Sequence, residues 1–412
     1  MRARLLIAAV CGTVLMSITS AQQPAPAEWF QWRGPNRDGI SPETGLLQQW
    51  PKSGPPLAWR FTGVGNGYSS FSTSGGRLYT LGARAGIEYV IALDRATGKK
   101  VWETQNGRRF ENDRGDGPRS TPTVEGDRLY VLGGSGDLTC FESATGKKIW
   151  SVNITQRFGG VNPYWGYSES PLIVGDRILV NTGGRRAGIA AVSKADGSTL
   201  WQQHSDGAGY SSPVLMQTGS LTHVVFFTES RAMAVDPRDG RLLWSYSKAN
   251  NGTANVATPI VRGTQVFVSS DYGTGGALLE VRAAGAATTA NEIYFTRDMR
   301  NHHSSSVLIG DHLYGFSSSI LTALRFAAGT VAWRDRSVGK GSLAFADNRL
   351  YLYSEDGVVG LADAAPEAYR ERGRFTLPQQ SGLPTWSHPM IAGGLLVIRD
   401  QEAVYAYNVR AQ

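Results

Sequence analysis

The sequence predicts an all-β fold: an eight-bladed β-propeller of four-stranded antiparallel blades, with the ring closed by an N-terminal strand. Three observations predict it. A pair of motifs recurs with a period of about 45 residues, which is the length of one propeller blade. The 50 glycines, 16 tyrosines and 11 tryptophans suit many short strands joined by tight turns. The two ends of the repeat array are also incomplete in complementary ways.

Each repeat ends in a tail motif that leads to an aromatic residue. Residues 92–102 read ALDRATGKKVW, and residues 140–150 read CFESATGKKIW. We interpret this pattern as strand, tight turn, strand, because Asp and Thr form local hydrogen bonds in turns and Gly accepts a positive φ. The aromatic side chain then offers a large apolar surface between neighbouring sheets. The eight tail positions are Trp59, Trp102, Trp150, Trp201, Trp244, Tyr294, Trp333 and Phe375.

Each repeat begins with a head motif, of which residues 120–131 (STPTVEGDRLYV) are the clearest example. We expect the innermost strand of each blade to start here, next to a position that is most often proline. This proline position is occupied in chain order by Phe71, Pro122, Pro171, Pro213, Pro259, Ser306, Ser342 and Pro389. Eight heads and eight tails predict eight blades.

The first tail and the last head have no partner within their own repeat. Trp59 has no head before it, and Pro389 has no tail after it. We expect the strand around residues 57–61 to complete the blade built from about residues 386–409, which closes the ring without an open edge. An extended solenoid or a series of separate β-domains is the alternative, and the complementary ends argue against both.

The N-terminus has the three parts of a cleavable signal peptide. Arg2 and Arg4 precede an apolar run over residues 5–18, and a small-residue cleavage site ends at Ala21. A membrane anchor is the alternative, but the run is short for a bilayer and no second hydrophobic stretch follows, so we expect no transmembrane segment. We expect a periplasmic or secreted protein. The expected segments are a signal peptide over 1–21, an N-terminal arm over 22–54 and the propeller over 55–412.

Charge and cysteine content exclude several kinds of site. The formal net charge falls from +7 to +5 when Arg2 and Arg4 are removed, and no lysine- or arginine-rich tract is present. We therefore expect no binding to nucleic acid, which needs clustered basic residues. Beyond residue 21 only Cys140 remains, which excludes an intramolecular disulfide, a cysteine zinc site and a haem-attachment motif. We expect a monomer.

The tail pattern A-x-D-x-x-T-G-x-x-x-W resembles the pyrroloquinoline-quinone (PQQ)-like propeller repeat. That family includes quinoprotein alcohol dehydrogenases and the propeller subunit of the outer-membrane β-barrel assembly machinery. The resemblance covers about residues 55–410, and residues 32–41 (WRGPNRDGIS) resemble the N-terminal arm of exported bacterial proteins of this type. The repeat implies the fold and leaves the activity open, because it builds the blades and not the site.

Two positions before the proline position, six of eight residues are Ser or Ala, which suits a crowded axis. The residues are Ser69, Ser120, Glu169, Ser211, Ala257, Ser304, Lys340 and Ser387. Glu169 and Lys340 break the pattern in blades that face each other across an eight-fold ring. We expect them to approach across the channel. The alternatives are a structural ion pair that closes the channel, and two independently solvated charges.

One position earlier the heads carry aromatic and polar residues, which predict either a pocket at the channel mouth or a decorated rim. They are Tyr68, Arg119, Ser168, Tyr210, Val256, His303, Gly339 and Trp386, with Tyr167, Asn255, His302 and His388 as neighbours. Adjacent residues of a strand point to opposite faces. We therefore expect one of His302 and His303 to point inward and the other outward, and we predict no metal site there.

The family resemblance implies PQQ, a flat polyanion, together with Ca²⁺ as a possible cofactor. The expected cofactor-binding residues are Arg119, Glu169, Tyr210, Asn255, Lys340 and Trp386, with Glu169 and Asn255 as weak candidates for Ca²⁺ ligands. The quinoprotein dehydrogenases commonly stack PQQ on a disulfide of adjacent cysteines and use an aspartate base. This chain lacks the cysteine pair, and its comparable stretch over residues 300–304 offers His303 as the candidate catalytic base.

Two functions from different classes follow. The first is a non-catalytic binding or scaffolding module of the cell envelope, with an envelope protein or a small molecule as partner. Phe158, Trp165 and Tyr167 are its candidate contacts, unless they are packed blade structure. The alternative is a PQQ-dependent alcohol or sugar dehydrogenase with an atypical site at the channel mouth, built from Arg119, Lys340 and His303.

Overall fold

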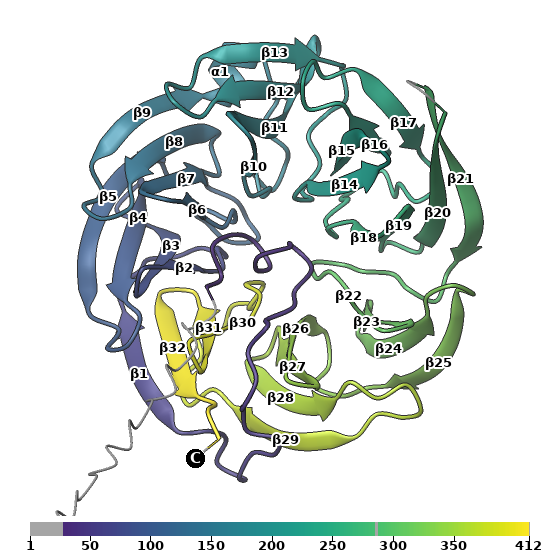
Figure 1. Cartoon of the computed structure of the whole chain (residues 1–412). Helices are drawn as coiled ribbons and strands as arrows, with labels where there is room; N and C mark the ends of the chain where they lie inside the picture. Colours follow the sequence, from purple (N-terminus) through teal and green to yellow (C-terminus); the bar gives the residue numbers. More distant parts are fainter. Residues whose placement is uncertain (1–27, 285–286, 412) are drawn as a thin grey trace, which may run out of the picture.

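A computed structural model describes residues 28–284 and 287–411 of the chain. The expected signal peptide over 1–21 lies outside the described residues, as does the start of the arm. The described part forms eight four-stranded antiparallel sheets arranged around a central channel (Figure 1). The predicted eight-bladed propeller is therefore confirmed. No helix within the described ranges has the length and apolar character needed to cross a membrane.

The first four blades run from the centre of the ring outward in chain order. Blade 1 contains β2 (Ser72–Ser74), β3 (Arg77–Arg84), β4 (Ile87–Asp94) and β5 (Lys100–Arg108). Blade 2 contains β6 (Thr123–Glu125), β7 (Arg128–Leu132), β8 (Asp137–Glu142) and β9 (Lys148–Asn153). Helix α1 (Ile154–Phe158) follows, and blade 3 contains β10 (Leu172–Val174), β11 (Arg177–Gly184), β12 (Ala187–Ser193) and β13 (Thr199–Gln203). Blade 4 contains β14 (Val214–Thr218), β15 (Leu221–Phe227), β16 (Ala232–Val235) and β17 (Leu242–Tyr246).

The remaining blades repeat this order, and the last one borrows a strand from the N-terminal region. Blade 5 contains β18 (Ile260–Arg262), β19 (Gln265–Ser270), β20 (Gly275–Ala284) and β21 (Ala287–Thr296). Blade 6 contains β22 (Val307–Ile309), β23 (His312–Ser317), β24 (Ile320–Arg325) and β25 (Thr330–Asp335). Blade 7 contains β26 (Gly341–Ala346), β27 (Arg349–Ser354), β28 (Val358–Asp363) and β29 (Glu371–Thr376). Blade 8 contains β30 (Met390–Ala392), β31 (Leu395–Asp400), β32 (Ala403–Asn408) and β1 (Leu57–Thr62).

The ring closes through antiparallel pairing of β1 with β32. Trp59 lies opposite Ala406, and Thr62 lies opposite Ala403. The first tail and the last head thus share one blade, as the complementary ends of the repeat array predict. Because β1 supplies the fourth strand, blade 8 has the same four-stranded sheet as the other seven blades.

The tail motif joins each blade to the next one. The indole Nε1–H of Trp102 in blade 1 donates to the Ser143 carbonyl in the β8–β9 turn of blade 2, over 3.1 Å. Gly146 in the same turn has φ +73°, and a Cβ atom there would stand 2.4 Å from Trp102. Six tail residues donate in this way to the next blade: Trp59, Trp102, Trp150, Trp201, Tyr294 and Trp333. The motif therefore needs glycine both for its backbone conformation and for the neighbouring ring.

The N-terminal arm lies across the channel and forms hydrogen bonds with every blade (Figure 1). Arg37 is buried, and its guanidinium group donates to the carbonyls of Ser170, Pro171 and Pro213. Blade by blade, the partners of the arm are Thr73, Val124, Ser170 with Pro171, Pro213, Thr258, Ser306, Phe345 and Val409. The arm therefore links all eight blades, in addition to the contacts between neighbouring sheets.

Candidate functional site

The channel mouth opens into a cavity of about 620 Å³, whose wall is built largely from the residues that precede the inner strands. Seven of the eight residues three positions before the proline position line it: Tyr68, Arg119, Ser168, Tyr210, Val256, His303 and Trp386. Each reaches the axis because the chain enters the innermost strand of its blade directly afterwards. Lys340, His302 and His388 line the cavity as well, and Trp32 brings the arm into its wall.

Aromatic rings cover much of the cavity wall. Tyr68 and Trp386 lie with their ring centroids 4.8 Å apart, tilted by 31°. On another side, Trp165 and Tyr210 lie 5.5 Å apart, and the Tyr210 hydroxyl accepts a hydrogen bond from the Trp165 backbone N–H. Tyr272 adds a further ring beside His302, at 5.3 Å. Such faces suit a flat ligand, because offset and tilted ring contacts stabilise aromatic partners.

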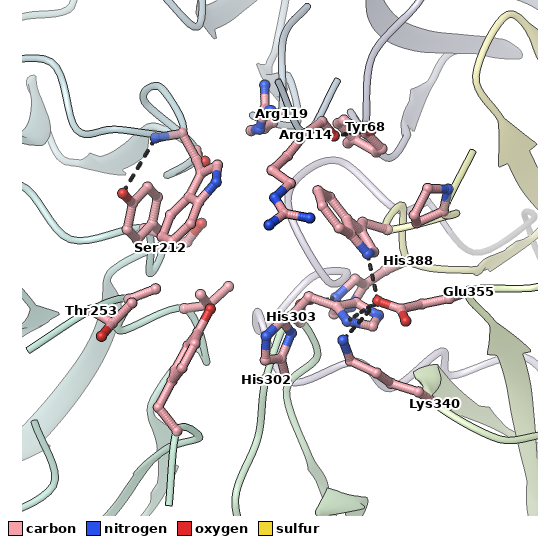
Figure 2. Close-up of a pocket in the computed structure, with 18 of the residues that line it drawn as sticks. Tyr68, Arg114, Arg119, Ser212, Thr253, His302, His303, Lys340, Glu355 and His388 are labelled. Atoms are coloured by element: carbon pink, nitrogen blue, oxygen red, sulfur yellow. Dashed lines mark hydrogen bonds and ion pairs between the residues drawn. The ribbon is translucent and has the colours of Figure 1, made fainter. Parts of the chain in front are cut away.

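Two arginines of one loop contribute to the wall in different ways. The Arg119 guanidinium donates to the carbonyls of Gly115 and Gly117 in its own loop and lies 5.1 Å from the centroid of the Tyr68 ring. Burial lowers its pKa. Arg114 is exposed, and its guanidinium group points into the cavity (Figure 2). Arg119 is therefore held by the protein, whereas Arg114 offers its donors to a ligand.

Lys340 pairs with Glu355, a residue that the sequence reasoning did not single out. Lys340 Nζ lies 3.0 Å from Glu355 Oε1, and the Trp386 indole N–H donates to the same oxygen over 2.6 Å (Figure 2). His303 Nδ1 lies 3.4 Å from this oxygen as well. Glu355 Oε1 therefore contacts one residue from each of blades 6, 7 and 8.

The expected approach of Glu169 to Lys340 across the channel is wrong. Glu169 is buried, and its Oε1 accepts the Asn181 backbone N–H over 2.6 Å, while its Oε2 has no hydrogen-bond partner among the residues that the structure describes. Burial raises the Glu169 pKa to about 8, and the charge of Arg37 opposes this shift. Glu169 is therefore held within blade 3 and does not line the cavity at the channel mouth.

Asn255, Phe158 and Tyr167 also have structural surroundings. The Asn255 side-chain amide donates to the carbonyls of Thr228 and Glu229, and Asn255 is almost fully buried. The geometry therefore does not support Glu169 or Asn255 as Ca²⁺ ligands. Phe158 and Tyr167 are buried within one hydrophobic cluster, so of the three aromatic residues expected at a partner surface only Trp165 reaches the cavity.

His302 and His303 both line the cavity, which corrects the expectation that they point to opposite faces. The alternation rule applies to strands, and these residues lie in a bend that precedes β22. His302, His303 and Glu355 present three potential ligand atoms within 4.8 Å of one another. Burial and the charge of Lys340 lower the pKa of His302, and lower that of His303 well below its usual range.

His388 supports this group from blade 8. Its Nε2 lies 3.2 Å from the His303 carbonyl oxygen, and its ring centroid lies 4.6 Å from that of Trp32. Burial lowers the His388 pKa to about 3, so the ring is neutral at physiological pH. Because a carbonyl only accepts hydrogen bonds, Nε2 is the nitrogen that carries the proton.

Sequence reasoning missed Arg114, Thr253, Tyr272, Glu355 and the contribution of Trp32. Tyr272 and Glu355 lie in the turns between the second and third strands of blades 5 and 7. These turns lie at the same end of each blade as the start of the inner strand, because neighbouring strands are antiparallel. A comparison of the second turns of the repeats would have identified both positions.

The residues of the cavity fit a flat anion but not a calcium-dependent PQQ centre. Ca²⁺ takes six to eight oxygen ligands, and Glu355 is the single carboxylate among the residues that line this cavity. Its Oε1 already contacts Lys340 and Trp386. Cys140 is buried within the β7–β8 pair, away from the lining residues, and offers no disulfide platform. We therefore derive no catalytic step through PQQ.

The chain resembles known propellers. A family model described as outer membrane protein assembly factor BamB matches residues 86–335. No curated protein matches the chain. The structure of BamB from Moraxella catarrhalis has a TM-score of 0.62 and 14% identity, with 86% of this chain and 99% of that one covered.

Two dehydrogenase structures share the fold as well. The quinohemoprotein alcohol dehydrogenase from Comamonas testosteroni has a TM-score of 0.65 and 13% identity, with 93% of this chain and 80% of that one covered. The quinohemoprotein alcohol dehydrogenase ADHIIG from Pseudomonas putida HK5 has a TM-score of 0.63 and 13% identity, with 94% and 81% covered. At these identities the likeness establishes the fold, and function must be argued from the site.

Proposed function

Since the chain belongs to the family of PQQ-like repeat propellers described as outer membrane protein assembly factor BamB, we propose that it acts as a non-catalytic binding module of the cell envelope. Its ligand site is the cavity at the channel mouth. The ligand class is a flat, anionic small molecule. The envelope location is part of the proposal, and it rests on the signal-peptide pattern of residues 1–21.

The observation that carries this proposal is the pairing of aromatic faces with cationic donors in one cavity. The volume of about 620 Å³ falls within the range typical of small-molecule pockets. Trp386 and Tyr210 stand on different sides of the cavity and provide flat apolar surfaces. Arg114 presents a planar guanidinium group, which suits the carboxylates of an anionic ligand because it donates two parallel hydrogen bonds.

The dehydrogenase alternative finds less support in the same cavity. A base must be free to accept a proton from the substrate, and the single carboxylate of the wall, Glu355, is engaged by Lys340 and Trp386. His303, the candidate base, has a side chain only 9% exposed. Its catalytic role remains a prediction, and the binding module is the function that the geometry favours.

A calorimetric titration with PQQ tests the proposed function. PQQ serves as a probe for flat polyanions, and the titration is run with and without added Ca²⁺. We expect binding with a Kd on the order of 1 μM that is independent of Ca²⁺, because the cavity supplies cations but no calcium ligand set. Arg114→Gln should weaken binding about ten-fold, which corresponds to the loss of one charge-assisted hydrogen-bonding group.

The matched control is Arg108→Gln, which removes an exposed arginine from the outer strand β5. Its affinity for PQQ should equal that of the unaltered protein. Equal losses in both variants would indicate a general charge effect and contradict a site at Arg114. Binding only in the presence of Ca²⁺, with PQQ reduced on addition of an alcohol, would support the dehydrogenase instead.

A further inference from the structure

We propose that His302, His303 and Glu355 form a binding site for a divalent first-row transition-metal ion, for which Zn²⁺ is the reference case. The site lies in the wall of the channel-mouth cavity. It is independent of the proposed anionic ligand, because the three side chains bind the metal on their own.

The geometry brings the three donors together from two neighbouring blades. His302 and His303 lie in the bend before β22 of blade 6, and Glu355 lies in the β27–β28 turn of blade 7. Their potential ligand atoms lie within 4.8 Å of one another. In a tetrahedral zinc site with bonds of about 2.0–2.1 Å, the donors stand roughly 3.3 Å apart. Small side-chain rotations are therefore enough to close the site.

The histidine nitrogens supply a second, independent observation. Nδ1 of His302 and both ring nitrogens of His303 are buried and have no hydrogen-bond partner among the described residues. The His303 side chain is only 9% exposed. Buried polar atoms are almost always paired, so His302 Nδ1 and His303 Nε2 point to a partner that the described residues do not provide, whereas His303 Nδ1 already lies 3.4 Å from Glu355 Oε1. A metal ion satisfies one nitrogen of each ring directly.

The donor set decides which ions fit. Two imidazoles and one carboxylate suit Zn²⁺, Co²⁺, Ni²⁺ and Cu²⁺, whereas Ca²⁺ requires more oxygen ligands than this wall offers. Three protein ligands leave a fourth position for water or for an anionic group in the cavity.

Replacing Lys340 tests the proposal, because the site predicts whether metal affinity should rise or fall. Its Nζ lies 3.0 Å from Glu355 Oε1 and competes with a metal ion for the carboxylate. A metal ion must also overcome the repulsion between its charge and the ammonium group. Lys340→Met should therefore tighten metal binding, whereas His302→Ala and Glu355→Gln should weaken it. If the Lys340–Glu355 ion pair has only a structural role, neither the unaltered protein nor any of these three variants should bind the metal ion.

The experiment is a calorimetric titration of the full mature protein with ZnCl₂ alone, without any organic ligand. We expect one Zn²⁺ per chain, with affinity reduced about ten-fold or more in His302→Ala and Glu355→Gln. Co²⁺ substitution supplies a second readout, because its visible absorption bands report the ligands. His312→Ala is the matched control, since it removes an imidazole from β23, outside the cavity lining, and it should bind like the unaltered protein.

Thermal melting of each variant establishes that it is folded. The proposal is overturned if the unaltered protein binds no Zn²⁺, or if folded His302→Ala and Glu355→Gln bind it unchanged. It is also overturned if Lys340→Met weakens binding. Because PQQ is absent from this titration and Zn²⁺ is absent from the PQQ titration, failure of one proposal is distinguishable from failure of the other.

Discussion

Gly146 of blade 2 packs against the six-membered ring of Trp102 in blade 1. A Cβ atom at Gly146 would stand 2.4 Å from the ring, and the backbone there has φ +73°. The indole N–H donates to Ser143 in the same turn. Trp102 thus makes both a packing contact and a hydrogen bond with the same turn of the next blade. This explains why the turn and the aromatic residue recur together along the chain.

Gly146→Ala should destabilise the protein through this contact. The added methyl group displaces the Trp102 ring and strains the positive φ. We expect the free energy of unfolding to fall by about 1–3 kcal/mol from overpacking, in addition to about 1 kcal/mol from the backbone. Urea denaturation followed by tryptophan fluorescence measures the change.

Gly126→Ala in the same blade separates the two contributions. Gly126 has φ +58°, but a Cβ atom there meets nothing within 4 Å. This control should show the backbone contribution alone. Equal losses of stability in the two variants would show that contact with Trp102 contributes nothing.

Glu169 should make stability depend on pH in the neutral range. Its folded-state pKa is about 8, above the reference value of 4.5, so the native state holds the proton more tightly than the unfolded state does. Stability should therefore fall as pH rises from about 4.5 to about 8. Glu169→Gln should remove this part of the slope, which is about 1.4 kcal/mol per pH unit at most.

Denaturation curves at several pH values between about 5 and 9 measure this slope. Glu88, whose pKa burial raises to about 7, contributes a similar slope to both proteins and does not cancel the difference. Glu367→Gln is the control, because Glu367 is exposed, and it should retain the slope. An unchanged slope in Glu169→Gln would contradict a protonated, buried Glu169.

Arg37→Met should weaken the link between the arm and the blades. It removes the donor that the carbonyls of Ser170, Pro171 and Pro213 share, and of these only Pro171 keeps a second donor among the described residues, the Thr123 hydroxyl. Each buried acceptor left unpaired costs about 1 kcal/mol or more, so the two carbonyls of Ser170 and Pro213 lead us to expect a loss of about 2 kcal/mol. Limited proteolysis should cut the arm sooner than in Arg186→Met, which removes an exposed arginine from the β11–β12 turn. Equal cleavage rates would show that Arg37 does not anchor the arm.

Arg119 should contribute mainly to stability, and Arg114 should contribute mainly to binding of the anionic ligand. Arg119→Gln removes donors from the carbonyls of Gly115 and Gly117 and should lower the free energy of unfolding by about 1–3 kcal/mol. Arg114→Gln should leave stability within about 0.5 kcal/mol, because its side chain is exposed. Thermal melts of both variants, compared with their PQQ titrations, test this separation. A destabilised Arg114→Gln would contradict it.

The fold was predictable in detail because the repeat encodes it locally. Every tail residue from Trp59 to Phe375 lies on the outermost strand of its blade, and every inner strand starts at or within one residue of its proline position. The closing strand was predictable from Trp59 and Pro389 alone, since each lacked a partner. A period that recurs eight times leaves few ways to arrange the chain.

The site was predictable only where the repeat reaches it. The position shared by Tyr68 and Trp386 lines the cavity because the repeat fixes its distance from the inner strand. Glu355 lies in the turn between the second and third strands of its blade, which the head and tail motifs do not include, and Arg114 lies in the loop that joins blades 1 and 2. His302 and His303 were misjudged because a bend replaces the strand that the alternation rule assumes.

The pairing of β1 with β32 also affects when the protein can complete its fold during synthesis. The two strands are separated by about 350 residues in the sequence. β1 is synthesised early, and the ring can close only after β32 has been synthesised. Until then the strand edges that will pair at this seam are unpaired and can form hydrogen bonds with other chains. A nascent or truncated molecule that ends before β32 (Ala403–Asn408) therefore cannot pair β1 and cannot close the ring.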